Sequence, residues 1–280
     1  MQPGAAGARL LDAAPLGGEA GGPGDRRLSL SRDRAENAQK NDRTPWLKEQ
    51  WVIAPEANAA FVCAMEDTLE VYQRPYDERR PLVCFDEGTK QLVKDVRAPL
   101  PAAPGHLERV DYAYERNGTG NLCMLFAPLA GRREVLVTAR RTAVDYAEAI
   151  RHLVDGCHPK ADQIILGQDN LNTHKLASLY EAFPPEEARR LIGTLEVHST
   201  PKHGSWLNMA EIELGVVRRQ CLDGRMPDFL PLTDEVPAWQ SARNAAQVKV
   251  NWQFTTADAR VKLKRLYPIL EPVKCMWMHH

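Results

Sequence analysis

The segment Leu82-Val83-Cys84-Phe85-Asp86-Glu87-Gly88 opens with four apolar residues and then changes abruptly to two carboxylates and a glycine. Such a short apolar run predicts a buried strand, which we expect to end at Asp86. Residues 163–167 repeat the pattern, because they lead into Gln168-Asp169-Asn170. Two buried strands that each end in an aspartate predict that the two acids converge, although they are far apart in the sequence.

The sequence around these two strands predicts an α/β fold. Residues 110–116 and 121–127 flank Asn117-Gly118, a dipeptide that favours a tight hairpin. Thr142 and Asp145 resemble a capping box at the start of a helix. We expect further strands at 134–138 and 194–199, and helices at 55–72, 173–182, 208–221 and 234–248. Strands in a meander, followed by strands that alternate with helices, favour a mixed sheet flanked by helices.

Composition limits the classes of function. The 280 residues carry 36 basic and 37 acidic side chains, a net charge of -1, which excludes a globally basic nucleic-acid coat but permits a local basic surface. No apolar run reaches the roughly 18–20 residues of a membrane span, and no secretory signal is apparent, so we expect a cytoplasmic protein. The six cysteines are scattered without a CxxC pair. Cys157-His158 and His152 are too loosely arranged to indicate a metal site.

The acidic residues predict a cation site. Glu211 and Glu213 open the helix expected at 208–221, and one of them can join Asp86 and Asp169. Hard divalent cations such as Mg²⁺ prefer oxygen ligands, and two ions about 3.5–4 Å apart can activate an attacking oxygen and stabilise a leaving oxygen at phosphorus. The alternative is that Asp86 and Asp169 only cap turns after their strands, as aspartate often does.

Three sequence motifs, taken together, resemble those of a known family. They are Val83-Cys84-Phe85-Asp86-Glu87, Gln168-Asp169-Asn170 with His174 five residues after Asp169, and Ser205-Trp206-Leu207-Asn208-Met209-Ala210-Glu211. They resemble the DDE transposases of the mariner-like bacterial group known as insertion sequence 630, over about residues 46–267. The resemblance implies a ribonuclease-H-like fold with a mixed five-stranded sheet flanked by helices.

The resemblance also implies a chemistry and partners. Asp86, Asp169 and Glu211 would be the catalytic residues and would hold two Mg²⁺ or Mn²⁺ ions, with no organic cofactor. The expected partners are DNA, as transposon ends and target DNA, and a second copy in a homodimer, with no membrane. The protein would be bacterial, cytoplasmic, and associated with the nucleoid when bound to DNA.

Several residues keep two interpretations. Glu213 remains a rival to Glu211, and two residues apart on a helix they point about 200° from each other, so at most one faces the aspartates. His174 is either a contact to the scissile phosphate or a structural histidine. Lys202, His203 and Trp206 are candidates for DNA contact, although Trp206 also fits a core position.

Other stretches also stay open. Glu87 faces away from Asp86 if the strand continues, at the surface or behind the site. Residues 184–190 look like extra material relative to the family. The basic residues between Arg243 and Arg265 form either a phosphate-binding face or a solvated helix surface.

The N-terminal region departs from the family pattern. We expect residues 1–45 to be a disordered or low-complexity segment, 46–80 a helical lead-in, 81–267 the catalytic domain and 268–280 a tail. Relatives carry helix-turn-helix modules before the catalytic domain, but the residues before Trp46 show no apolar periodicity, so we expect this module to be absent. The alternatives are therefore an inactive truncated transposase or a DNA-binding domain of the same fold, or an unrelated nuclease that cuts without joining.

Overall fold

The computed structural model of the protein describes residues 58–269. The predictions for the N-terminal segment 1–45, for the missing helix-turn-helix module, for the start of the helical lead-in and for most of the tail lie outside these residues. Within residues 58–269, no helix is both long and apolar enough to cross a membrane.

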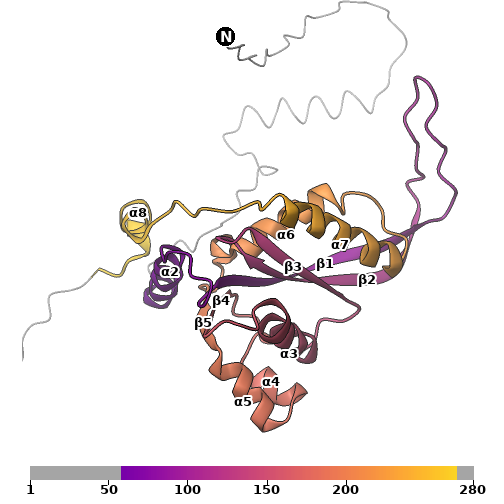
Figure 1. Ribbon diagram of the computed structural model, residues 1–280. Coiled ribbons are helices and arrows are strands. Elements are labelled where there is room, and N and C mark those ends of the chain that lie inside the picture. Colours follow the sequence, from indigo (N-terminus) through magenta and orange to yellow (C-terminus); the bar gives the residue numbers. More distant parts are fainter. Residues whose placement is uncertain (1–57, 270–280) are drawn as a thin grey trace, which may run out of the picture. The chain divides into compact units, whose positions relative to one another are not determined.

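Five strands form one mixed sheet in the order β3-β2-β1-β4-β5 (Figure 1). The strands are β1 (Leu82–Asp95), β2 (Tyr114–Ala127), β3 (Arg132–Thr138), β4 (Ile164–Gln168) and β5 (Leu195–Ser199). The first three pair antiparallel, whereas β4 runs parallel to β1 and β5 parallel to β4. This order and these directions are those of a ribonuclease-H-like fold, so the predicted fold class is confirmed.

Helices cover both faces of the sheet (Figure 1). On one face lie α6 (Met209–Gln220) and α7 (Phe229–Ala245), and on the other α3 (Ala143–Arg151), α4 (Ala177–Ala182) and α5 (Pro185–Gly193). The alternation of side chains along β1 serves both layers, because Cys84 packs in the α6 layer while Val83 and Phe85 pack in the α3 layer. The capping box of Thr142 and Asp145 starts α3 as predicted.

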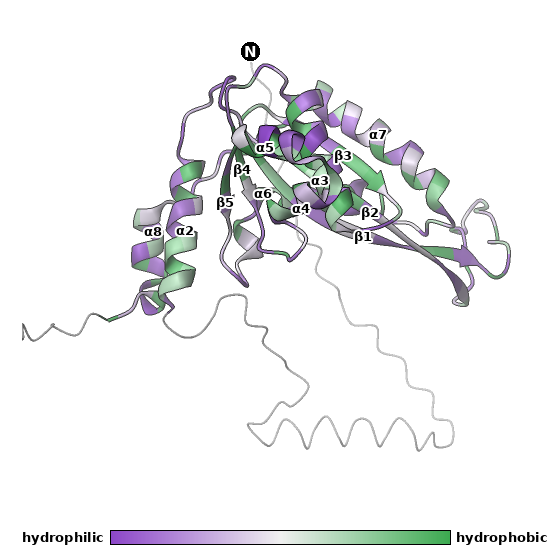
Figure 2. Ribbon diagram, turned by 90° about the horizontal axis from the view of Figure 1, so that it is seen from below, coloured by the Kyte–Doolittle hydropathy of each residue, from purple (hydrophilic) through white to green (hydrophobic). Residues whose placement is uncertain are grey.

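A third, smaller core holds α2 (Ala59–Tyr72) and α8 (Thr256–Lys262), which lie side by side (Figure 1, Figure 2). It contains Phe61, Met65 and Leu69 of α2 and Leu207 of the short 3₁₀ turn Ser205–Leu207. The hydroxyl of Tyr72 donates a hydrogen bond to the backbone oxygen of Leu207 at 2.7 Å. The helical lead-in therefore supports the segment that enters α6.

Two predictions about β1 and β2 were wrong. Strand β1 does not end at Asp86 but continues to Asp95, paired with β2 over most of its length. Asn117-Gly118 makes no hairpin, because β2 is continuous and these two residues lie opposite Leu92 in a bulge. Gly118 does adopt a positive φ of 89° there. The chain reverses between β1 and β2 in residues 96–113.

Several helix predictions needed correction, whereas β3, β4, β5 and α6 lie within one or two residues of their predicted positions. Helix α2 begins at Ala59 because Asn58 caps it, and α4 is shorter than predicted. The segment interpreted as extra material forms α5, which begins at Pro185. Helix α7 begins five residues earlier than predicted, at Phe229 after the cap Asp228, and α8 was not predicted.

Candidate active site

The register of β1 against β4 brings Asp86 and Asp169 together. The two strands are parallel, and Cys84 lies opposite Gly167. Asp86 and Asp169 each follow two residues after this pair, so they extend from the same edge of the sheet. The expectation that the two aspartates converge is therefore met, although Asp86 lies inside its strand and only Asp169 follows the end of one.

Asp86 is a buried carboxyl group, and few protein groups compensate the negative charge of its ionised form. It is 9% exposed, and its Oδ1 accepts a hydrogen bond from the backbone N–H of Glu87 at 2.7 Å. Burial, together with the charges of Asp169 and Glu211, raises the pKa of Asp86 to about 7 against the opposing effects of the Glu87 N–H and of His174. Asp169 and Glu211 therefore lie close enough to Asp86 to act on its charge, as a cation site requires.

Asn208 explains why Glu211 lies near Asp86. Its Oδ1 caps α6 by accepting from the N–H of Ala210 at 3.0 Å, and its Nδ2 donates to the backbone oxygen of Phe85 at 2.8 Å. The first turn of α6 is therefore attached to β1 one residue before Asp86. Glu211 lies in this turn with an exposed side chain.

Glu213 occupies a different environment from Glu211. Its side chain is 2% exposed and contacts Arg133 at 2.9 Å and Arg243 at 2.7 Å. Arg133 is itself fully buried, so Glu213 compensates buried positive charge between α6, β3 and α7. Of the two rivals, only Glu211 acts electrostatically on Asp86.

His174 connects Asp169 to Glu87. Its Nδ1 hydrogen-bonds Oδ1 of Asp169, and its Nε2 lies 3.4 Å from Oε2 of Glu87, which also pairs with Arg141. Burial lowers the pKa of His174, but its two carboxylate partners outweigh burial and raise the pKa to about 9. Burial alone would raise the pKa of Asp169 and of Glu87, yet His174 beside both of them, and Arg141 beside Glu87, leave the two pKa values below the usual range.

The side chain of His174 has no exposed surface, which favours the structural interpretation of this residue, whereas its contact with the scissile phosphate stays a prediction. Its ring stacks on Tyr146 with centroids 5.1 Å apart and meets the ring of Phe85 edge-on at 4.9 Å. Glu87 does face away from Asp86, but it is buried behind the site and is not at the surface.

Gln168 completes the support of Asp169, and the sequence analysis missed it. The hydroxyl of Tyr146 donates to Oε1 of Gln168 at 2.8 Å, and Nε2 of Gln168 donates to the backbone oxygen of His174 at 2.8 Å. A polar residue that ends a buried strand directly before Asp169 was the available signal. Gln168 holds the turn from β4 to His174, and therefore the position of Asp169.

The three candidate DNA contacts after β5 differ in exposure. Lys202 and His203 are exposed, and His203 adopts a positive φ of 62°. Trp206 is half-buried, with its ring 6.1 Å from that of Phe254, so the core interpretation fits it better. Stacking of its indole on a base stays a prediction.

Acidic side chains compensate part of the positive charge between residues 243 and 265. Arg243 pairs with Glu213, Arg260 with Glu66 and Lys262 with Asp258. Within residues 58–269, Lys249, Lys264 and Arg265 form no ion pair, and all three are exposed. A small part of the predicted basic face is thus free for phosphate contact.

The chemistry of the donor set fits a hard divalent cation. Asp86, Asp169 and Glu211 offer carboxylate oxygens, the ligands that Mg²⁺ and Mn²⁺ prefer. Among the described residues these oxygens do not all lie within 4.8 Å of one another, as expected for like charges that repel. Asp169 is fixed by His174, Asp86 by its strand and Glu211 by the capped helix.

Comparison with known proteins identifies a family. Residues 81–232, which are more than half of the 280, match the model of the family described as DDE superfamily endonuclease. No curated protein matches the sequence.

Several solved structures of Mos1 complexes are similar at low identity. The crystal structure of the Mos1 mariner paired end complex with Mn is 16% identical, with a TM-score of 0.47, covering 83% of this chain and 78% of that chain. The paired end complex with Mg is 17% identical, with a TM-score of 0.47 and coverages of 92% and 85%. The Mos1 Strand Transfer Complex is 16% identical, with a TM-score of 0.45 and coverages of 83% and 78%.

Proposed function

We propose that this chain, which belongs to the DDE superfamily endonucleases, is the catalytic domain of a DNA transposase similar to the mariner-like insertion sequence 630 group. The observation that carries the proposal is the convergence of Asp86 and Asp169 from neighbouring parallel strands, with Glu211 close enough to raise the pKa of Asp86. The catalytic domain would span residues 81–267, with residues 46–80 as its helical lead-in.

In this proposal Asp86, Asp169 and Glu211 hold two Mg²⁺ or Mn²⁺ ions. Such ions, when bound, lower the barrier for attack of an oxygen nucleophile at phosphorus and stabilise the leaving oxygen. Water would attack a phosphodiester at the transposon end and release a 3′ hydroxyl, which would then attack target DNA and displace a 3′ oxygen there. Neither step needs a covalent bond to a protein side chain.

The residues behind the carboxylates have positioning roles. His174 and Gln168 hold Asp169, Asn208 holds the start of α6, and the buried Glu87 holds His174 through its charge. Lys202 and His203 extend from the loop that leads to α6 and are the proposed contacts to DNA phosphates. The partner is DNA, handled by two copies of the chain at paired ends, in the cytoplasm of a bacterial cell.

Strand cleavage and joining test this proposal. Full-length protein is incubated with supercoiled plasmid and with a pre-cut DNA end, with Mg²⁺ or Mn²⁺, and compared with Asp169→Asn. The matched control is Asp162→Asn, because Asp162 is an exposed aspartate just before β4 that pairs with Arg79.

We expect cleavage and joining by the wild type and by Asp162→Asn, and neither by Asp169→Asn. Cutting without joining would favour a nuclease of the same fold. A folded wild-type protein with no activity on either substrate would indicate an inactive remnant and would contradict the proposal.

A further inference from the structure

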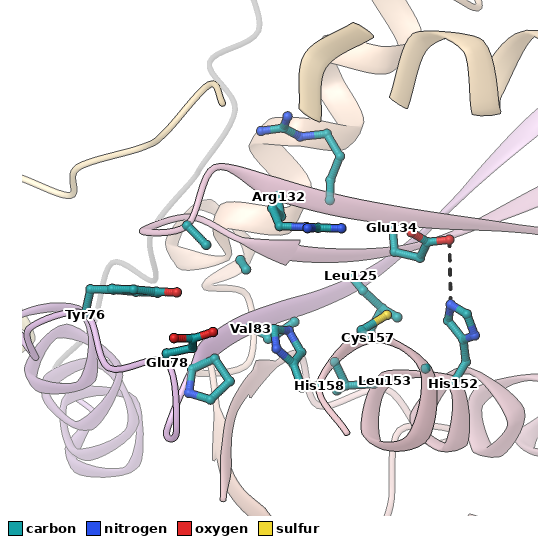
Figure 3. Close-up of a pocket in the computed structure, with 15 residues that line it drawn as sticks. Tyr76, Glu78, Val83, Leu125, Arg132, Glu134, His152, Leu153, Cys157 and His158 are labelled. Carbon is teal, nitrogen blue, oxygen red and sulfur yellow. Dashed lines mark ion pairs between the residues drawn. The ribbon is translucent and has the colours of Figure 1, made fainter. Parts of the chain in front are cut away.

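A second group of possible metal ligands lies on the other face of the sheet from Asp86. Glu134 of β3, His152 and Cys157 each offer one ligand atom, and these atoms all lie within 4.8 Å of one another. They line one pocket, together with Arg132 and His158 (Figure 3). The sequence spacing of His152 and Cys157 gave no convincing metal site, and the fold supplies the missing third residue from β3.

A π-helical turn brings His152 and Cys157 together. Helix α3 changes at Arg151 into a π turn over His152–Cys157, and the N–H of His158 bonds the oxygen of Leu153, five residues earlier, at 3.0 Å. In an α-helix, five residues cover about 1.4 turns, which would place these side chains roughly 140° apart. The wider π turn places them on one side, and such turns are frequent at functional sites.

Gly156 makes room for the imidazole. A Cβ at this position would lie 3.0 Å from Nδ1 and 3.1 Å from Cε1 of His152, so the ring rests against the glycine backbone. The ring points toward β3, where its Nε2 lies 3.6 Å from Oε1 of Glu134 (Figure 3). That Nε2 is buried and has no hydrogen-bond partner among residues 58–269. An unpartnered buried nitrogen aimed at a carboxylate and a thiol is suited to a metal ion.

Gln240 of α7 orients Glu134. Its Nε2 donates to Oε2 of Glu134 at 2.8 Å, while its Oε1 accepts from the N–H of Val135 at 2.7 Å. The second carboxylate oxygen of Glu134, its Oε1, therefore stays directed at His152. Metal-ligating carboxylates usually have an outer hydrogen-bond partner of this kind, which fixes their orientation.

Metal binding at this site requires deprotonation of the Cys157 thiol. Burial, together with the negative charge of Glu134, raises the pKa of this thiol to about 11 against the opposing charge of Arg132. A bound divalent cation reverses this balance, because coordination deprotonates the thiol.

We propose that Glu134, His152 and Cys157 bind one Zn²⁺, with the fourth position open to the pocket. Sulfur, nitrogen and oxygen ligands together suit Zn²⁺ and not the Mg²⁺ expected at the carboxylate site. Zn–ligand bonds of about 2.0–2.3 Å need ligand atoms about 3.3–3.8 Å apart, which small side-chain movements provide. The ion would join β3 to the end of α3.

Cobalt spectroscopy on the full-length chain tests the site. Co²⁺ is titrated into metal-free, reduced protein, and displacement by Zn²⁺ then gives the zinc affinity. We expect one equivalent to produce thiolate-to-cobalt charge transfer and the visible bands of tetrahedral Co²⁺. Cys157→Ser should abolish the charge transfer, and Glu134→Gln and His152→Gln should weaken zinc binding more than about 100-fold, beyond what loss of an outer partner causes.

Two variants serve as controls. Cys221→Ser removes another partly buried free thiol, far from this pocket in the sequence, and Asp86→Asn removes a carboxylate from the proposed catalytic site. Both should keep the charge transfer and the zinc affinity. Gly156→Ala, which pushes on the His152 ring, should weaken binding about 10-fold or more.

A thermal readout covers the case in which a variant folds poorly. Zn²⁺ should raise the melting temperature of the wild type and of Cys221→Ser, but not that of Cys157→Ser or Glu134→Gln. Wild-type protein without charge transfer, or charge transfer that survives in Cys157→Ser, would overturn the site. Because activity on DNA is not measured, the outcome is independent of the proposed function.

Discussion

The side-chain amide of Asn208 donates a hydrogen bond to the backbone oxygen of Phe85 at 2.8 Å. The same side chain caps α6 by accepting from the N–H of Ala210. One fully buried residue thus attaches the helix that carries Glu211 to the strand that carries Asp86. Asp86 and Glu211, which are 125 positions apart in the sequence, are thereby held in one site.

Asn208→Ala should lose both stability and activity. The variant leaves the buried oxygen of Phe85 unpaired and removes a helix cap, so we expect about 2–4 kcal/mol of destabilisation in urea unfolding. Strand cleavage should fall strongly even where the variant is folded, because Glu211 is no longer fixed. Asn58→Ala removes the cap of α2 and serves as the control, which should retain cleavage per folded molecule. Equal cleavage by both variants would show that Asn208 is not a positioning residue.

Glu211→Gln and Glu213→Gln should separate activity from stability. Glu211 is exposed, so Glu211→Gln should change stability by less than about 0.5 kcal/mol while abolishing cleavage. Glu213→Gln leaves Arg133 buried without its counter-charge, so we expect about 3–5 kcal/mol of destabilisation. Its folded fraction should still cleave DNA. Thermal unfolding and cleavage by each protein test this, and the opposite pattern would make Glu213 the third carboxylate.

Asp86 should make the metal-free protein less stable as the pH rises. The pKa of this carboxyl is 3.8 when unperturbed and about 7 in the folded chain, so the folded state binds the proton more tightly. The cost of the ionised form is absent below about pH 4 and fully present above about pH 7. Asp86→Asn should therefore be more stable than the wild type at pH 8, by on the order of 2–4 kcal/mol, and similar at pH 4.

Urea unfolding in the presence of a chelator, at pH 4 and pH 8, measures this difference. Asp162→Asn is the control, because that aspartate is exposed and its pKa is lowered by Arg79. Mg²⁺ at pH 8 should stabilise the wild type more than Asp86→Asn. If the stability difference between the wild type and Asp86→Asn does not change with pH, the folded protein does not disfavour the ionised form of Asp86.

Local sequence predicted the layers of the fold but not where every element ends. The change from Phe85 to Asp86 indicated a strand end, yet β1 continues, since the charge of Glu87 is compensated by Arg141 and His174 from distant segments. Gly118 takes the positive φ that its sequence favours, but in a bulge and not in a hairpin. A dipeptide specifies a backbone angle, whereas pairing with β1 decides whether the chain turns.

In the candidate site too, local sequence predicted some features, whereas others depend on contacts between distant segments. Asp86, Asp169 and Glu211 were predicted from the sequence motifs that contain them. The structure brings together the strands that carry Asp86 and Asp169. The environment of His174 could not be predicted from the sequence, because its burial depends on Tyr146 and Phe85 and its charge depends on Glu87. A helix cap at Asn208 is visible in the sequence, but its bond to Phe85 exists only in the folded chain.

Lys202→Ala should weaken DNA binding without preference for sequence. Lys202 is exposed in the loop before α6, and a lysine that contacts one phosphate displaces about one counterion. Fluorescence anisotropy with duplex DNA over a range of salt should show a slope of log affinity against log salt that is smaller by about 1. Lys160→Ala, at an exposed lysine after the π turn, is the matched control and should keep the wild-type slope. An unchanged slope in Lys202→Ala would place the DNA path elsewhere, and the exposed cations Lys249, Lys264 and Arg265 would then be the next surface to test, since they form no ion pair within residues 58–269.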